Sequence, residues 1–249
     1  LMDELVERVV QENSPIVGVF LHRNTEVGNG LYAPEEDGTI AMKRLSGRSW
    51  IEEDLDGVSV RIGPGDFYQT HPELALPLYQ RALDRLDLRK DDAFVDLYCG
   101  VGGLTMLGAR RCQHAIGVEQ VGGAVLSAKD SAKRNGLRCE FIAGDVLQVL
   151  PSVAKRLKHP MVAVDPSRRG LHPEIVKELI AMQPRRLVYI SCNARTMARD
   201  LALFREGGAT LESVELFDLF PHTAHVECVT ALSFPVESGR APRRKLVRR

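Results

Sequence analysis

The sequence predicts an α/β fold: a doubly wound, mostly parallel sheet of Rossmann-like topology with a small N-terminal α/β subdomain. Three observations support this prediction. From residue 93 onward, segments with strand periodicity alternate with segments of helical periodicity. Residues 161–165 and 187–191 are apolar almost throughout, as strands covered on both faces are. A glycine-rich turn, residues 99–103, directly follows the first strand of this alternating region.

The composition is that of an ordinary globular protein. The chain has 249 residues, of which 44% are hydrophobic and 27% charged, and this excludes disorder or a fibrous architecture as its main state. Lys plus Arg equals Asp plus Glu, at 33 each, so net charge identifies no partner. No apolar run is long enough to span a membrane, and no signal peptide opens the chain. The cysteines are widely spaced without a CxxC pair, which argues against disulfides or zinc and favours a reducing cytoplasm.

The first 60 residues have the pattern of the small subdomain. Apolar residues at Leu1, Leu5 and Val9 predict a helix over residues 1–12. Alternating patterns predict three strands, over residues 16–24, 38–45 and 57–63. Because the chain opens at Leu1 inside a helical pattern, we expect this subdomain, residues 1–60, to be the remnant of a longer N-terminal region.

The main domain is expected over residues 61–236. It opens with an amphipathic helix after His71, in which Pro72 takes an early-turn position. Predicted strands span residues 93–98, 114–119, 139–145, 161–166 and 185–192. Predicted helices span residues 104–112, 123–136, 146–157 with a break at Pro151, 173–182 and 196–208. Residues 209–220 and 227–234 predict a closing antiparallel hairpin, and the basic residues 237–249 a disordered tail.

Acids and glycines gather at the predicted C-terminal ends of consecutive strands, where open α/β sheets bind ligands. Asp96 precedes the glycine turn that contains Gly100, and this acid favours a ligand with a cationic amino-acid end. Glu119 ends the second strand, where its carboxylate can accept hydrogen bonds from both ribose hydroxyls. Asp145 ends the third strand, a placement suited to an adenine amino group. Together these residues predict S-adenosylmethionine binding; a generic nucleotide-binding Rossmann fold is the alternative.

The turns after the fourth and fifth strands carry residues suited to catalysis. Asp165 begins one turn, Cys192 lies in the other, and Glu227 begins the last strand. A cysteine at such a position is often an inert buried residue. A thiol, a carboxylate and a methyl donor together, however, fit one reaction, the methylation of uracil at C5. Addition of a thiolate to C6 of uracil makes C5 nucleophilic, and a base then removes the C5 proton. The alternative, a metal pair at His222 and His225, lacks a third ligand, so we expect no metal.

Six segments, in this order, resemble those of the RNA uracil-5-methyltransferases, which make 5-methyluridine in ribosomal and transfer RNA: FYQTH, DLYCGVGG, GVEQ, DPSRRG, SCNARTMARD and FDLFPHTAHVE. The resemblance runs from about residue 55 to 236 and looks closest to the 23S ribosomal RNA branch. It implies Cys192 as the nucleophile that forms a covalent adduct with C6 of the target uridine, and Glu227 as the base. It also implies cofactor or target-pocket roles for Gln69, Tyr98, Glu119 and Asp165. Transfer RNA is the alternative substrate.

The chain departs from the family pattern at three positions. Ser167 stands where a second proline is usual, His71 where asparagine is frequent, and Gly103 where some members carry a cofactor-contacting asparagine. Ribosomal members commonly have an N-terminal four-cysteine iron–sulfur motif, and some have a small β-barrel RNA-binding domain. Neither occurs in this sequence, so an iron–sulfur cluster would belong to an upstream segment.

RNA is the expected partner. The target base must leave its stack to reach a methyl donor at the strand ends, and we expect Arg168 and Arg169 to help hold the RNA. Arg195 and Arg199 are further candidates for phosphate contacts. The alternative for each of these arginines is a solvent-exposed charge near the start of a helix. Two other interpretations stay open: an amino-group methyltransferase that uses the Asp165 turn, and an inactive RNA-binding module. We expect a cytoplasmic monomer that binds no membrane.

Overall fold

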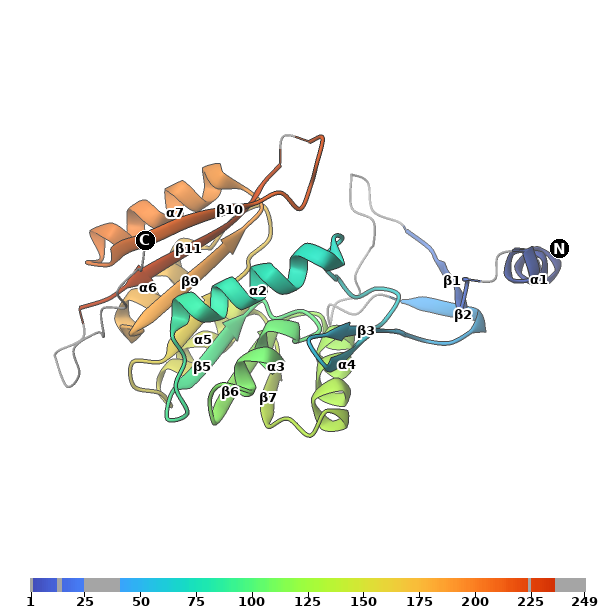
Figure 1. Ribbon diagram of the computed structural model, residues 1–249, viewed down its shortest axis with the longest axis horizontal. Coiled ribbons are helices and arrows are strands. Elements are labelled where there is room, and N and C mark those ends of the chain that lie inside the picture. Colours follow the sequence, from blue (N-terminus) through green and yellow to red (C-terminus); the bar gives the residue numbers. More distant parts are fainter. Residues whose placement is uncertain (1, 13–14, 25–40, 224, 236–249) are drawn as a thin grey trace.

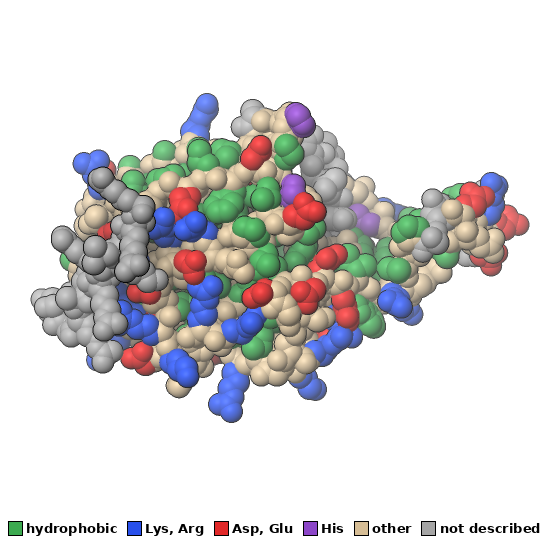
Figure 2. All heavy atoms as spheres, viewed as in Figure 1, with side chains coloured by type: hydrophobic (Ala, Val, Ile, Leu, Met, Phe, Trp, Pro, Cys, Tyr) green, Lys and Arg blue, Asp and Glu red, His purple; other side chains and the backbone are tan. Residues whose placement is uncertain are grey.

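The computed structural model describes residues 2–12, 15–24, 41–223 and 225–235. The predicted tail and the first residues of the strand predicted over 38–45 lie outside these ranges. On the face seen in Figure 2, basic and acidic side chains are interspersed over the described surface. This agrees with the even balance of charge in the sequence.

A seven-stranded sheet forms the centre of the protein, in the order β10-β11-β9-β8-β5-β6-β7. Five strands are parallel: β5 (Ala93–Leu97), β6 (His114–Glu119), β7 (Cys139–Ala143), β8 (Met161–Val164) and β9 (Arg186–Ser191). Strand β11 (Glu227–Ser233) runs antiparallel between β9 and β10 (Thr210–Phe217). The predicted doubly wound, mostly parallel sheet with a closing antiparallel hairpin is confirmed.

Helices cover both faces of this sheet (Figure 1). One face packs against α2 (Pro72–Leu86), α3 (Gly103–Ala109) and α4 (Gly122–Arg134). The other face packs against α5 (Val146–Ala154), α6 (Pro173–Met182) and α7 (Ala194–Glu206). Neighbouring residues of a strand enter different cores: on β5, Phe94 belongs to the first core and Val95 to the second. After β5, strands β6 and β7 are added on one side of it, and β8 and β9 on the other. This reversal of strand order places a binding crevice at the C-terminal end of β5.

The N-terminal elements lie to one side of the sheet (Figure 1). Helix α1 (Met2–Glu12) precedes a two-stranded antiparallel sheet of β1 (Gly18–His22) and β2 (Met42–Gly47). The hairpin of β3 (Ile51–Leu55) and β4 (Val58–Ile62) then packs its apolar side chains into the core beneath α3 and α4. The hairpin therefore shares a core with the main domain, whereas a domain boundary at residue 60 stays a prediction.

Two local expectations are wrong. Strand β3 was not predicted, because three acids follow Ile51 and hide the alternation; the Asp56-Gly57 turn, with both φ angles positive, is a strong hairpin signal in retrospect. Helix α5 continues through Pro151 instead of breaking there. Proline has a φ compatible with a helix and removes one hydrogen bond, whose acceptor would be the carbonyl of the exposed residue Leu147.

Candidate active site

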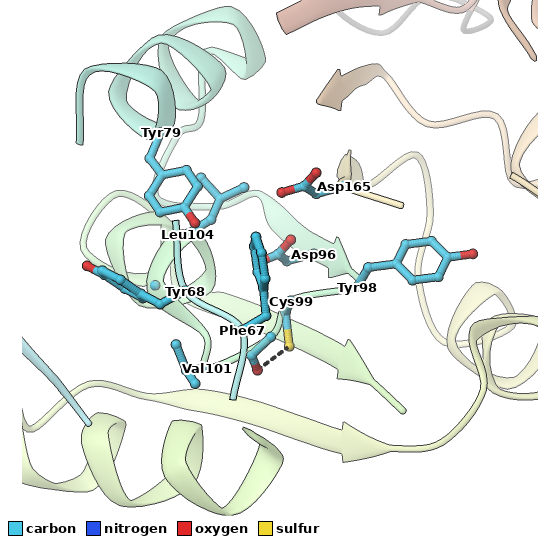
Figure 3. A pocket seen from close by; sticks show the side chains of 11 residues that line it. Phe67, Tyr68, Tyr79, Asp96, Tyr98, Cys99, Val101, Leu104 and Asp165 are labelled. Atoms are coloured by element: carbon cyan, nitrogen blue, oxygen red, sulfur yellow. Dashed lines mark hydrogen bonds between the residues drawn. The ribbon is translucent and has the colours of Figure 1, made fainter. Parts of the chain in front are cut away.

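A pocket lies at the C-terminal ends of β5 and β8 (Figure 3). It brings together Tyr98, Gly100 and Asp165, which the sequence predicted, with Asp96. In Figure 3 the carboxylates of Asp165 and Asp96 face the same space, whereas the ring of Tyr98 is directed away from them. The remaining lining residues are Phe67, Tyr68, Tyr79, Cys99, Val101, Gly103 and Leu104.

The turn after β5 needs glycine for two reasons. Gly100 and Gly102 both have positive φ, at 52° and 80°. A Cβ on Gly102 would also lie 2.7 Å from the ring of Phe141, so the turn can pack onto the sheet only without a side chain there. Gly100 lines the pocket, and without a side chain there a ligand can approach the backbone of the turn closely.

Glu119 ties this turn to the next one. One carboxylate oxygen accepts a hydrogen bond of 3.0 Å from the Gly100 N–H, and the other accepts one of 2.8 Å from the Val121 N–H. Asp145 is the N-cap of α5, and its Oδ1 accepts a 2.8 Å hydrogen bond from the Leu147 N–H. Both acids therefore lie at consecutive strand ends, as predicted, and each keeps acceptor capacity for a ligand.

Three carboxyl groups in or beside the pocket resist ionisation. Burial raises the pKa of Asp96 to about 7, although Thr105 Oγ1 donates a 2.6 Å hydrogen bond that lowers it. Burial likewise raises the pKa of Asp165 to about 7. Burial and the charge of Asp165 raise the pKa of Glu227 to about 8. A cationic ligand in this pocket would relieve their repulsion and favour their ionised forms, so the donor set fits a sulfonium with an amino-acid end.

Cys192 and Glu227 are brought together by strand register. Cys228 on β11 pairs with Ser191 on β9 in an antiparallel ladder, so Glu227 and Cys192 are the next residues in that register. Burial and the Glu227 carboxylate raise the pKa of the Cys192 thiol, while a hydrogen bond from the Arg168 guanidinium lowers it. The predicted nucleophile, base and one predicted arginine therefore form one group.

Gln69 lies 5% exposed at the edge of the same region. Its side-chain amide contacts the phenol of Tyr79, whose pKa burial raises well above its usual value. Tyr79 was missed by sequence reasoning, because within the helical pattern of α2 it cannot be told from a core residue. Its ring would lie 3.5 Å from a Cβ on Gly103, an ordinary van der Waals distance, so the ring lies beside the glycine turn. The exposed Phe67, at the rim of the pocket, was also missed.

Within the described ranges, no three His, Cys, Asp or Glu side chains lie close enough to hold a metal ion. Nor does that part of the chain contain a helix with the length and apolar character that crossing a bilayer requires.

Two family models match the chain. The model described as tRNA (uracil-5-)-methyltransferase matches residues 152–234, which include the Asp165 turn, Cys192 and Glu227. The model described as histone methylation protein DOT1 matches residues 68–149, which include the glycine turn.

Curated relatives and a solved structure extend this similarity. An uncharacterized RNA methyltransferase of Gloeobacter violaceus is 38% identical over 218 residues, which are 87% of this chain and 46% of that protein. One from Clostridium tetani is 40% identical over 189 residues, 76% of this chain and 41% of that protein. The chain thus spans less than half the length of these relatives. The crystal structure of Pyrococcus abyssi tRNA (uracil-54, C5)-methyltransferase in complex with S-adenosyl-L-homocysteine is 29% identical with a TM-score of 0.70, covering 87% of this chain and 50% of that one.

Proposed function

Since the chain belongs to the RNA uracil-5-methyltransferase family, we propose that it methylates C5 of a uridine in RNA, with S-adenosylmethionine as the donor. The observation that supports this most is the pairing of Cys192 with Glu227 by the register of β9 and β11, beside a pocket of buried carboxyl groups. A thiol nucleophile and a carboxylate base on adjacent strand ends are what C5 chemistry on uracil requires.

In this proposal, Cys192 and Glu227 act in succession. The Cys192 thiolate adds to C6, a C–S bond forms, and the π electrons of the C5–C6 bond move towards O4, which makes C5 nucleophilic. S-adenosylmethionine, when bound, supplies an electrophilic methyl group on a sulfonium. Once C5 carries the methyl group, the Glu227 carboxylate takes the C5 proton. The C5–C6 double bond then re-forms, and the C–S bond breaks to release the thiolate.

The residues at the strand ends fit the parts of the methyl donor. We assign the ribose hydroxyls to Glu119 and the adenine amino group to Asp145, because each carboxylate keeps acceptor capacity at its strand end. Asp165, with Asp96, suits the cationic amino-acid end. Three further residues complete the proposed cofactor site: Gln69, Tyr98 and Gly100.

We further propose that 23S ribosomal RNA is the substrate; transfer RNA, the substrate named for the P. abyssi enzyme, is the second candidate. The target base would be flipped out to reach the pocket. We also propose that the protein acts as a cytoplasmic monomer.

Methyl transfer is tested directly with radiolabelled S-adenosylmethionine and unmodified RNA. We expect label in RNA, and 5-methyluridine as the product after digestion and chromatography. Separate 23S ribosomal and transfer RNA substrates show which is preferred. Label in a modified adenine or cytosine, or in no nucleoside, would refute C5 methylation of uridine.

Exposed arginines beside the Cys192 turn are proposed to bind RNA phosphates. Reversing the charge of Arg168 and Arg169 together is expected to weaken RNA binding about tenfold or more at 0.1 M salt and to make the dependence on salt less steep, because two phosphate contacts are lost. Fluorescence anisotropy at several salt concentrations measures both quantities. Arg138→Glu, an exposed arginine just before β7 at the opposite end of the strands, is the matched control. Equal affinity in the double variant and this control would exclude the contact.

A further inference from the structure

Helix α7 binds the backbone of the loop over residues 165–171. At the N-cap of the helix, Asn193 Nδ2 donates a 2.9 Å hydrogen bond to the carbonyl oxygen of Arg168. Thr196 Oγ1, one turn later, lies 3.2 Å from the same oxygen and 3.2 Å from the Asn193 carbonyl oxygen, so its hydroxyl hydrogen is shared between the loop and the helix. The loop that begins with Asp165 is thereby held against the turn that contains Cys192.

The next turn of α7 continues the contact. Arg199 Nη2 donates to the carbonyl oxygens of Arg169 at 3.1 Å and Leu171 at 3.2 Å. Asp200, fully buried, accepts 2.8 Å hydrogen bonds from the Leu171 N–H and from the Tyr189 hydroxyl. Each of these contacts is to loop backbone or to the sheet. We name the four α7 residues the clamp: Asn193, Thr196, Arg199 and Asp200.

Gly170 shows how closely the loop and the clamp fit. It has a φ of +75°, and a Cβ there would lie 2.6 Å from Asp200 Oδ2 and 2.8 Å from Arg199 Nη2. No side chain could be added without moving the clamp. The spacing of the clamp residues, three, three and one along the helix, puts them on one face, so the segment NARTMARD has a structural reason for its polar pattern.

We propose that the clamp positions Arg168 and Asp165 against Cys192, and that it is required for the thiol to react. The arrangement also assigns Arg199 to the clamp instead of to RNA phosphates, because its guanidinium already pairs with Asp200 at 2.7 Å and binds two loop carbonyls. The clamp residues are positioning residues: they act through the loop. For the effect on methyl transfer, this inference rests on the proposed function.

The clearest test removes a tether without adding charge. Asn193→Ser keeps a side-chain oxygen that can cap α7 but loses the donor to Arg168. Thr196→Val is nearly isosteric and loses the second donor. Asn135→Ser is the matched control: Asn135 Nδ2 donates a 2.8 Å hydrogen bond to the Ser59 carbonyl oxygen of β4 and a 2.7 Å hydrogen bond to the Ser131 carbonyl oxygen of α4, on the β7 side of the sheet and far from Cys192.

The first measurement is the rate at which iodoacetamide alkylates Cys192 in the intact protein, followed by mass spectrometry of that peptide from pH 6 to 10. The charged and titratable groups that face this thiol are Arg168, Asp165, Glu227 and Cys228. We expect both α7 variants to change the pH dependence and to lower the rate at pH 8 about fivefold or more, because the guanidinium no longer stabilises the thiolate. Asn135→Ser should leave this profile unchanged even where it lowers the melting temperature.

The second measurement is methyl transfer, for which we expect kcat to fall about tenfold or more while KM for RNA changes little. Alkylation profiles in Asn193→Ser and Thr196→Val that match the profile of Asn135→Ser would overturn the proposal. Alkylation needs no substrate, so the two proposals fail separately: a wild-type protein that transfers no methyl group but shows the predicted alkylation differences would refute only the proposed function.

Discussion

Cys192→Ala is expected to abolish methyl transfer to RNA, lowering kcat about 10⁴-fold or more while leaving the fold and cofactor binding intact. Uracil C5 is too weak a nucleophile to take a methyl group without prior addition at C6. Among the described residues, Cys228 is the other cysteine beside Glu227, but it is buried in the core that α5, α6 and α7 cover. Cys192→Ser is expected to be as inactive, because a serine hydroxyl is hardly ionised at neutral pH.

The measurement is the initial rate with labelled methyl donor, alongside binding of S-adenosylmethionine by calorimetry. Cys139→Ala is the matched control: this cysteine begins β7, at the far end of the strands, and should keep activity within about threefold. Retention of methyl transfer by Cys192→Ala would show that another group activates C5, and the covalent mechanism would have to be abandoned. A parallel loss of cofactor binding would instead point to damage of the fold.

The parallel sheet could be predicted from the sequence because each of its strands is a short apolar segment followed by a helical pattern. The positions of the candidate site residues could be predicted for the same reason: Asp96, Glu119, Asp145 and Asp165 all lie within two residues of the C-terminal ends of parallel strands. Strand β3 could not be recognised in the sequence, because its acids face solvent or basic partners and so break the alternation of apolar and polar residues. Local pattern shows which residues are apolar, but it does not show which polar side chains find partners in the fold.

The closeness of Cys192 and Glu227 could not be derived from local pattern. They are separated by helix α7 and strand β10, and they meet only because β11 inserts between β9 and β10 in one register. A shift by one residue would turn Glu227 to the other face of the sheet. Tyr79 and the clamp were missed for a related reason. Tyr79 contacts the amide of Gln69, and most contacts of the clamp go to backbone groups of the loop over residues 165–171. The sequence shows that these side chains are polar, but not which partner each one finds.

Glu227→Gln is expected to trap the protein on its RNA. Glutamine has the same shape as glutamate but cannot take the C5 proton, so the C–S bond to Cys192 should persist after methyl transfer. Removing the carboxylate also removes one cause of the raised pKa of Cys192, so the addition step should not be slowed. Incubation with S-adenosylmethionine and unmodified RNA, followed by a denaturing gel, should show a band of protein linked to RNA.

If the mechanism holds, the trapped band requires the Cys192 thiol and appears only when Glu227, and not another glutamate, is replaced. It should vanish in the double variant Glu227→Gln with Cys192→Ala, and Glu206→Gln, at the exposed end of α7, should form no such band.

The pH dependence of product release tests the same residue. Burial and the charge of Asp165 raise the pKa of Glu227 to about 8, so the fraction of Glu227 that is ionised, and able to act as a base, increases as the pH rises. Product release by the wild type should therefore accelerate as the pH rises from about 7 to 9, whereas the small release by Glu227→Gln should not follow this curve. A Glu227→Gln protein that turns over at the wild-type rate would move the role of base to another group, and Asp165, whose charge acts on both Cys192 and Glu227, is the first candidate.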